Sequence, residues 1–163
     1  MSWTSKINSL VSGSQGTGIL GIHVSRAAAD MGATAVRIPL FTIAGGEILL
    51  TCLYGVCTVA ETGAANAIQF DATATVGNVF SPMDDGVGDI NGILVGGMIA
   101  PQGDITLPAV VAGPFTGNPT FSMPFICKVG TIGITKAAAT DAGTWRFEAY
   151  YIPLISGAVV TAA

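Results

Sequence analysis

Charged residues are scarce in this chain. Asp, Glu, Lys and Arg make up 10% of its 163 residues, against 50% apolar residues and 22 glycines. A typical chain is about 25% charged, and the surface of a soluble domain carries about 25–35% charged residues. Exposed apolar patches mark interaction sites. The composition therefore favours a subunit of an assembly, and the alternative is a monomer with an exceptionally neutral surface.

Catalytic signatures are also lacking. His23 is the only histidine, and acid–base enzymes most often use histidine together with carboxylates in a polar pocket. No nucleophile elbow, phosphate-binding loop or dinucleotide fingerprint is present, and the glycine-rich stretch 13–18 lacks the preceding strand that such a fingerprint needs. We expect a structural role for His23, no enzymatic activity and no cofactor.

The basic residues do not cluster. All six are isolated in the sequence: Lys6, Arg26, Arg37, Lys128, Lys136 and Arg146. Binding to phosphates requires clustered Lys and Arg, and the formal net charge is −4. These observations exclude a nucleic-acid partner and the basic arm of a coat protein that wraps its own genome.

Two long apolar stretches raise the question of a membrane. Residues 38–60 are long enough to span one, but they contain Pro39, the pair Gly45-Gly46 and many β-branched residues. Residues 105–127 carry no charge and are broken by four prolines. The N-terminal residues do not have the apolar core of a signal peptide. We therefore expect a soluble protein that is made in a cytoplasm and has no membrane partner.

The three cysteines, Cys52, Cys57 and Cys127, fit neither a zinc pattern nor a small disulfide framework. Buried free thiols, which behave as small apolar side chains, are the first interpretation. A bridge between Cys127 and one of the other two is the second.

The chain is expected to form an N-terminal arm over residues 1–21 and a single β domain over residues 22–163. Gly, Ser and Thr dominate the arm, and its apolar residues are isolated. Trp3, Ile7 and Leu10 are therefore candidate interface residues, with Trp3 either an anchor in a neighbour's pocket or part of the local core. Residues 25–30 (SRAAAD) carry a capping residue followed by helix formers, which predicts a short helix.

β-Rich runs follow one another along the remaining sequence. Residues 36–43 and 47–59 are joined by Ala-Gly-Gly, which predicts a hairpin. Further strands are expected over residues 67–75, 93–100, 106–111, 125–135 and 144–154. Seven to nine short strands with Gly, Pro and Asn turns indicate an all-β fold, an antiparallel β-sandwich or barrel, with a jelly roll among the candidates.

Two groups of residues are candidate sites. Asp84, Asp85 and Asp89 lie in a glycine-containing loop that is either a solvated turn or a weak site for a hard cation such as Ca²⁺. In strand 144–154, Arg146, Glu148 and Tyr150 share one face, while Trp145 and its alternate neighbours share the other. Arg146 and Glu148 form either salt bridges between subunits or an ordinary exposed pair.

Two parts of the chain resemble small structural proteins of tailed bacteriophages. One contains GEILLTCLYGV (residues 46–56) followed by AIQFDATAT (67–75), and the other runs from GTI (130–132) through TDAG (140–143) to the terminal TWRFEAYYIPLISGAVVTAA. The resemblance covers residues 36–80 and 130–163 and points to capsid decoration, or cement, proteins. It implies a β-rich protein, often a homotrimer, that sits on the outer capsid surface of the virion and binds the major capsid protein.

Three other functions remain open from the sequence. The first is a component of a phage tail tube, fibre or spike. The second is a small-ligand-binding β-barrel, which needs an interior pocket. The third, a secreted carbohydrate-binding module, is disfavoured by the missing signal peptide.

Overall fold

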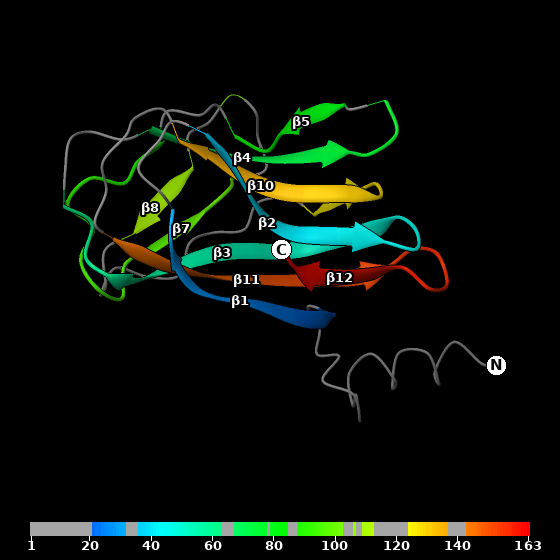
Figure 1. The fold of residues 1–163 in the computed structure, drawn as a ribbon, viewed down its shortest axis with the longest axis horizontal. Coiled ribbons are helices and arrows are strands. Elements are labelled where there is room, and N and C mark those ends of the chain that lie inside the picture. The colour runs from blue at the N-terminus through cyan, green and yellow to red at the C-terminus, as the bar shows by residue number, and fades with distance from the viewer. Residues whose placement is uncertain are drawn as a thin grey trace.

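Two antiparallel sheets packed face to face make up the protein (Figure 1). The computed structural model describes residues 21–31, 36–62, 67–77, 79–84, 88–102, 106, 109–112, 124–136 and 143–163. Over these residues the chain forms strands and no helix. The strands are β1 (Ile22–Asp30), β2 (Arg37–Ala44), β3 (Ile48–Val59), β4 (Ala67–Ala74), β5 (Phe80–Pro82), β6 (Gly88–Asp89), β7 (Met98–Ala100), β8 (Val110–Ala112), β9 (Phe125–Cys127), β10 (Gly130–Lys136), β11 (Thr144–Pro153) and β12 (Val159–Ala162).

The strand order in each sheet confirms the expected all-β sandwich. One sheet, called here the β11 sheet, has the order β1-β11-β3-β7-β8, and β9 also pairs with β3. The other, the β10 sheet, has the order β12-β2-β10-β4-β5, and β6 also pairs with β4. Successive strands from β9 to β12 alternate between the two sheets. Neither sheet is therefore formed by one continuous stretch of the chain.

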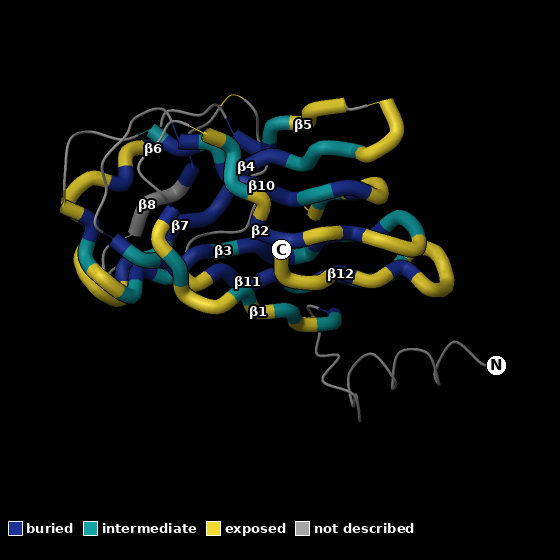
Figure 2. The backbone as a smooth tube through the Cα atoms, viewed as in Figure 1, coloured by how far each residue is buried: buried dark blue, intermediate teal, exposed yellow. Residues whose placement is uncertain are grey.

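The core lies between the sheets and is built from one face of each strand. On β11 the inward residues are Trp145, Phe147, Ala149 and Tyr151, all buried, as the alternation predicts. The rings of Phe147 and Phe70 of β4 meet edge to face across the layers, with centroids 6.4 Å apart and an angle of 75° between planes. Burying a side chain of this size contributes about 1.5–3 kcal/mol, so these alternate positions hold the sheets together. Figure 2 shows that the turns are largely exposed while buried residues lie along the strands.

The short helix predicted over residues 25–30 is wrong. These residues belong to β1, which pairs with β11 from Ile22 opposite Tyr151 to Asp30 opposite Thr144. Their alanines favour a helix locally, but Ile22 and Val24 pack against the core. The long neighbouring strand supplies backbone partners that an isolated helical turn does not have, and tertiary pairing therefore overrides propensity.

The hairpin predicted for residues 36–59 is also wrong. β2 pairs with β10 and β12, whereas β3 pairs with β11, β7 and β9. The Gly45-Gly46 turn thus carries the chain from one sheet to the other, so that Ile43 and Ile48 contribute to one core from opposite layers. A glycine turn between two apolar strands suits either geometry, and β3 takes its partners from strands far away in the sequence.

Two other predicted strands differ in extent. The run 125–135 is divided into β9 and β10, which lie in different sheets. In the run 93–100 only Met98–Ala100 forms a strand, because residues 94–97 make turns whose backbone bonds reach Cys57. The glycine-containing loop predicted around Asp84, Asp85 and Asp89 follows β5 and contains β6.

The β2–β3 turn packs directly against the β11–β12 turn. Gly45 has a φ of 74°, and a Cβ placed on it would lie 2.1 Å from the carbonyl oxygen of Gly157. Each of these turns connects the two sheets, and the contact holds them together at one end of the sandwich.

Replacing Gly45 by alanine is expected to destabilise the fold far more than the same change at Gly92. Gly92 has a similar φ of 72° with nothing near its Cβ position. Gly92→Ala therefore carries only the left-handed backbone strain of about 1–2 kcal/mol, whereas Gly45→Ala adds a backbone clash and should lose about 3 kcal/mol or more. Urea unfolding of the two variants measures the difference, and equal losses would rule out the turn-to-turn contact.

Candidate interaction surfaces

Three of the predicted interface residues lie together on the outer face of the β11 sheet. Arg146, Glu148 and Tyr150 alternate with the core residues of β11. Strand pairing places His23 of β1 opposite Tyr150 and Tyr54 of β3 opposite Glu148. The face therefore carries a polar cluster of these five side chains, called here the Glu148 cluster.

The carboxylate of Glu148 is the centre of this cluster. Its side chain is only 6% exposed although it points away from the core. His23 Nε2 donates to Glu148 Oε2 at 2.7 Å, and Arg146 Nε lies 2.6 Å from Oε1. The His23 ring stacks on Tyr150, with centroids 4.7 Å apart. Because a buried carboxylate needs partners of opposite charge or hydrogen bonds, Glu148 is not a member of an ordinary exposed pair.

Tyr54 completes the cluster. Burial raises the pKa of its hydroxyl to about 12, and the neighbouring Tyr150 and Glu148, as well as a hydrogen bond with Tyr150, act in the same direction. Tyr54 therefore stays protonated throughout the physiological range. The cluster is a network of one ion pair, hydrogen bonds and a ring stack on the outer face of the sheet.

All three cysteines are buried free thiols, which settles the two interpretations in favour of the first. Cys57 and Cys127 belong to the core, whereas Cys52 is buried on the other face of β3, opposite Tyr150. Burial raises the pKa of Cys52 and of Cys127 to about 12 from 9.0. A thiol is nucleophilic as the thiolate, so these groups are unreactive at neutral pH.

Stability is expected to fall as the pH rises above about 9. The unfolded chain loses its thiol protons near pH 9.0, while folded Cys52 and Cys127 keep theirs until about pH 12. The unfolded state then binds fewer protons, and the free energy of unfolding decreases across this window. Urea unfolding at pH 8 and pH 10.5 should show the loss, and Cys127→Ala should make the pH dependence shallower. An unchanged free energy of unfolding in the wild type would contradict the prediction.

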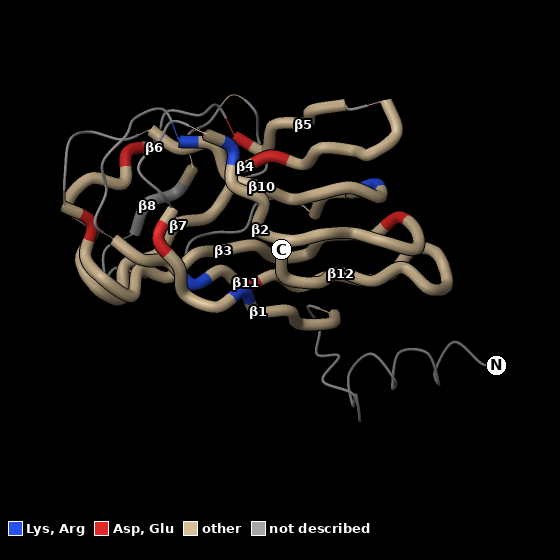
Figure 3. The backbone as a smooth tube through the Cα atoms, viewed as in Figure 1, with Lys and Arg blue, Asp and Glu red and all other residues tan. Residues whose placement is uncertain are grey.

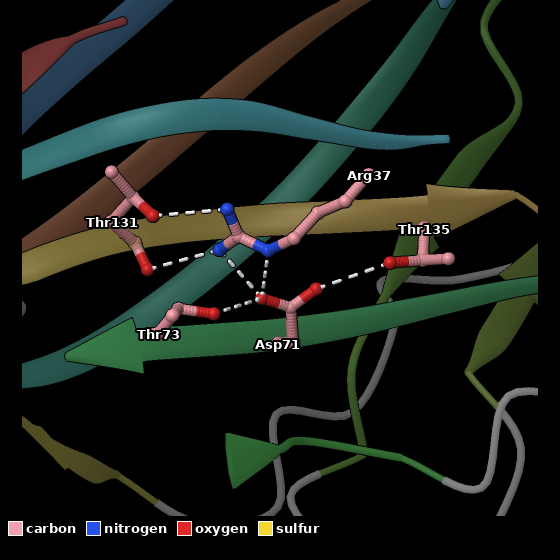
Figure 4. A network of polar contacts seen from close by, with 5 residues as sticks. All are labelled: Arg37, Asp71, Thr73, Thr131 and Thr135. Carbon is pink, nitrogen blue, oxygen red and sulfur yellow. Dashed lines mark hydrogen bonds and ion pairs between the residues drawn. The ribbon is translucent and has the colours of Figure 1, made fainter. Parts of the chain in front are cut away.

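An ion pair occupies the outer face of the β10 sheet (Figure 4). Arg37 Nε donates to Asp71 Oδ1 at 2.6 Å, and Nη2 lies at the same distance from that oxygen. The guanidinium also donates to the hydroxyl and carbonyl oxygens of Thr131. A Cβ on Gly133 would lie 2.7 Å from the guanidinium, so this glycine leaves room for Arg37 to lie flat across β10.

Removing Arg37 should be more costly than removing the pair. The Asp71 side chain is fully buried and that of Arg37 is 27% exposed. Arg37→Met leaves a buried carboxylate without its partner, with an expected loss of about 2–4 kcal/mol, somewhat below the 3–5 kcal/mol typical of a fully buried pair. Chemical denaturation should show that Arg37→Met with Asp71→Asn recovers part of this loss. A double variant less stable than Arg37→Met would exclude a pairing role.

The acidic residues of the predicted loop differ in their environments: Asp84 is buried and Asp89 is exposed. Asp84 is fully buried, and its Oδ2 accepts a hydrogen bond from the backbone N–H of Phe70 at 3.0 Å. Asp89 is exposed and accepts from the N–H of Asn91. Asp85 lies outside the described residues. Within the described part of the chain, no three His, Cys, Asp or Glu side chains come together as a metal site would require.

One end of the sandwich is apolar. Five exposed side chains, Ile126 of β9 and four from three turns, line two adjoining recesses of about 170 and 420 Å³: Val76, Val79, Ile126, Val129 and Ile155. We call this surface the apolar end. Val76 and Ile126 are 86% and 65% exposed. The turns at this end carry only one acidic and one basic residue, Glu47 and Lys128 (Figure 3).

Because several charged residues are buried, the surface carries even fewer charges than the composition suggests. Of the ten acidic and six basic residues, at least five are buried: Glu61, Asp71, Asp84, Lys136 and Glu148. Charged residues are almost never fully buried unless they are paired. The exposed surface thus has few charges to surround its apolar side chains.

Sequence reasoning missed the apolar end and the contribution of His23. His23 and Glu148 are 125 residues apart in the sequence, and only the strand register brings them together. The apolar side chains come from separate turns, and nothing in the sequence marks them as neighbours. Trp3, Ile7 and Leu10 lie outside the described residues, so their predicted interface role stays a prediction.

No helix among the described residues is long and apolar enough to cross a membrane. Comparisons with known protein families, with curated proteins and with solved structures find no match to this chain.

Proposed function

We propose that this protein is a non-enzymatic structural subunit that self-associates and binds a larger protein shell. The apolar end carries this proposal. It groups five exposed apolar side chains, and elsewhere in the protein at least five of the charged residues are buried. Contiguous exposed apolar surface is typical of protein–protein contacts, and burying it contributes about 25 cal/mol per Å².

The specific form of the proposal is a capsid decoration protein. The resemblance of residues 36–80 and 130–163 to decoration proteins of tailed phages supports it, with the major capsid protein as the partner. A homotrimer on the outer surface of the virion is the expected form. Attachment would depend on burial of apolar surface against the shell. Many symmetry-related copies on one shell would add avidity to weak individual contacts.

The side chains that could perform chemistry have structural roles instead, which supports a non-enzymatic function. Glu148 forms an ion pair with Arg146 and a hydrogen bond with His23, and Asp71 forms an ion pair with Arg37. The thiols of Cys52 and Cys127 have raised pKa values. These contacts stabilise the two sheets.

A small-ligand-binding β-barrel fits the structure less well. The space between the sheets is filled by the packed core, and the more enclosed recess of about 170 Å³ lies at the end of the sandwich. Ligand pockets are typically about 300–1,000 Å³. A tail-tube, fibre or spike component remains the alternative among virion proteins.

The mass of the purified full chain tests the proposal. Light scattering should give a particle of about three times the chain mass. A trimer of this mass would have the closed symmetry that is usual for homo-oligomers. The particle should co-sediment with capsid shells of the phage whose genome encodes the chain. Stacked hexameric rings would favour the tail-tube alternative, and a monomer that does not bind shells would exclude the decoration role.

Deleting residues 2–20 should leave the fold intact and weaken attachment. The first described strand, β1, begins at Ile22 and pairs along β11, so the deletion removes none of the described pairing. The circular dichroism spectrum should match that of the full chain, and less truncated protein should co-sediment with shells. Unchanged occupancy on shells would remove the proposed role of the arm.

A further inference from the structure

Two opposite charges line one recess of the apolar end. Glu47 lies in the β2–β3 turn and Lys128 between β9 and β10, and both line the recess formed with Val76, Val129 and Ile155. Among the described residues, neither Glu47 nor Lys128 is a partner in the ion pairs His23–Glu148, Arg37–Asp71 and Arg146–Glu148. The recess therefore presents one carboxylate and one ammonium group in an apolar frame.

We infer that the apolar end is where copies of this chain associate, with Glu47 of one copy paired with Lys128 of the next. The inference rests on the proposed self-association and names its surface. A surface that bears both a charge and its complement on two separate turns suits a symmetry-related copy of itself. In a closed homo-oligomer, pairing Glu47 of each copy with Lys128 of the next can then satisfy both charges of every copy.

The charge pattern argues for a second copy over other occupants. A strongly acidic or basic partner would meet one residue of its own sign, and like charges placed together at an interface are costly. A second copy brings net neutrality and five further apolar side chains to the contact. A ring of polar groups around an apolar centre is the usual anatomy of such an interface.

The position of β1 is consistent with this arrangement. Ile22 pairs with Tyr151, just before β11 ends at Pro153 and the chain turns through Ile155. The described chain therefore begins, at Gly21, beside the apolar end. Deleting residues 2–20, which lie outside the described residues, tests whether they compete with a second copy for the recess; in that case the deletion would strengthen self-association.

Charge reversal in the full chain tests the inference. Glu47→Lys and Lys128→Glu each place like charges across the contact, and each should raise the dissociation constant of the oligomer at least about tenfold. The double variant restores opposite charges in exchanged positions and should return within about threefold of the wild type. Sedimentation velocity over a range of protein concentrations measures these constants.

Two matched apolar variants complete the test. Val76→Asp introduces a charge at the apolar end and should produce monomers. Val95→Asp changes another exposed valine, 58% accessible, in the turn beside Cys57, near the opposite end of β3 from the Gly45-Gly46 turn. It should leave the oligomer unchanged. Circular dichroism and thermal unfolding confirm that each variant is folded.

Each outcome separates this inference from the proposed function. A wild type that self-associates while the charge reversals and Val76→Asp have no effect would overturn the inference and leave the structural-subunit proposal standing. A double variant as weak as the single ones would exclude the Glu47–Lys128 pairing. Stronger association after deletion of residues 2–20 would identify the arm as the occupant of the recess. A wild type that is monomeric at every concentration would overturn both proposals.

Discussion

The pairing of β11 with β1 and β3 is the interaction on which both faces of this protein depend. On the inner face it aligns Trp145, Phe147, Ala149 and Tyr151 with the opposite sheet. On the outer face the same register places His23 against the carboxylate of Glu148, which Arg146 of β11 itself also contacts. A shift of one residue would exchange the two faces and would bury the charged side chains without partners. The core and the Glu148 cluster therefore specify the same register.

Charge is used sparingly and mostly inside the structure. His23 with Glu148 links the neighbouring strands β1 and β11, and Arg37 reaches from β2 across β10 to Asp71 of β4. Asp84 accepts a hydrogen bond from the backbone of β4. Each contact satisfies a buried carboxylate that would otherwise be costly. The consequence is a surface with few charges, on which an apolar end closed by the Gly45–Gly157 contact stands out. The charged residues that stabilise the sheets from within are therefore absent from the surface proposed for assembly.

The sequence predicted elements that depend on local alternation and missed those that depend on distant partners. The two faces of β11 and the all-β class followed from the alternation in residues 144–154 and from regular turn signals. Residues 25–30 were expected to be helical because alanine favours a helix, but the free edge of β11 recruits them as a strand. The turn at Gly45-Gly46 was expected to close a hairpin, since a glycine pair has the same local signature whether its two strands share a sheet or not.

By itself, then, the sequence determined the layer class, the residues that face the core along its strongest strand, and the poverty of charge. These properties are local or compositional, and period-two alternation expresses them directly. Only the tertiary structure decided that Glu148 is buried between His23 and Arg146, that Asp71 lies under Arg37, and that separate turns join in one apolar end. The register of strands far apart in the sequence sets those neighbours. That register is chosen by the fit of the whole core, because a local segment does not carry the information about which distant strand will lie beside it.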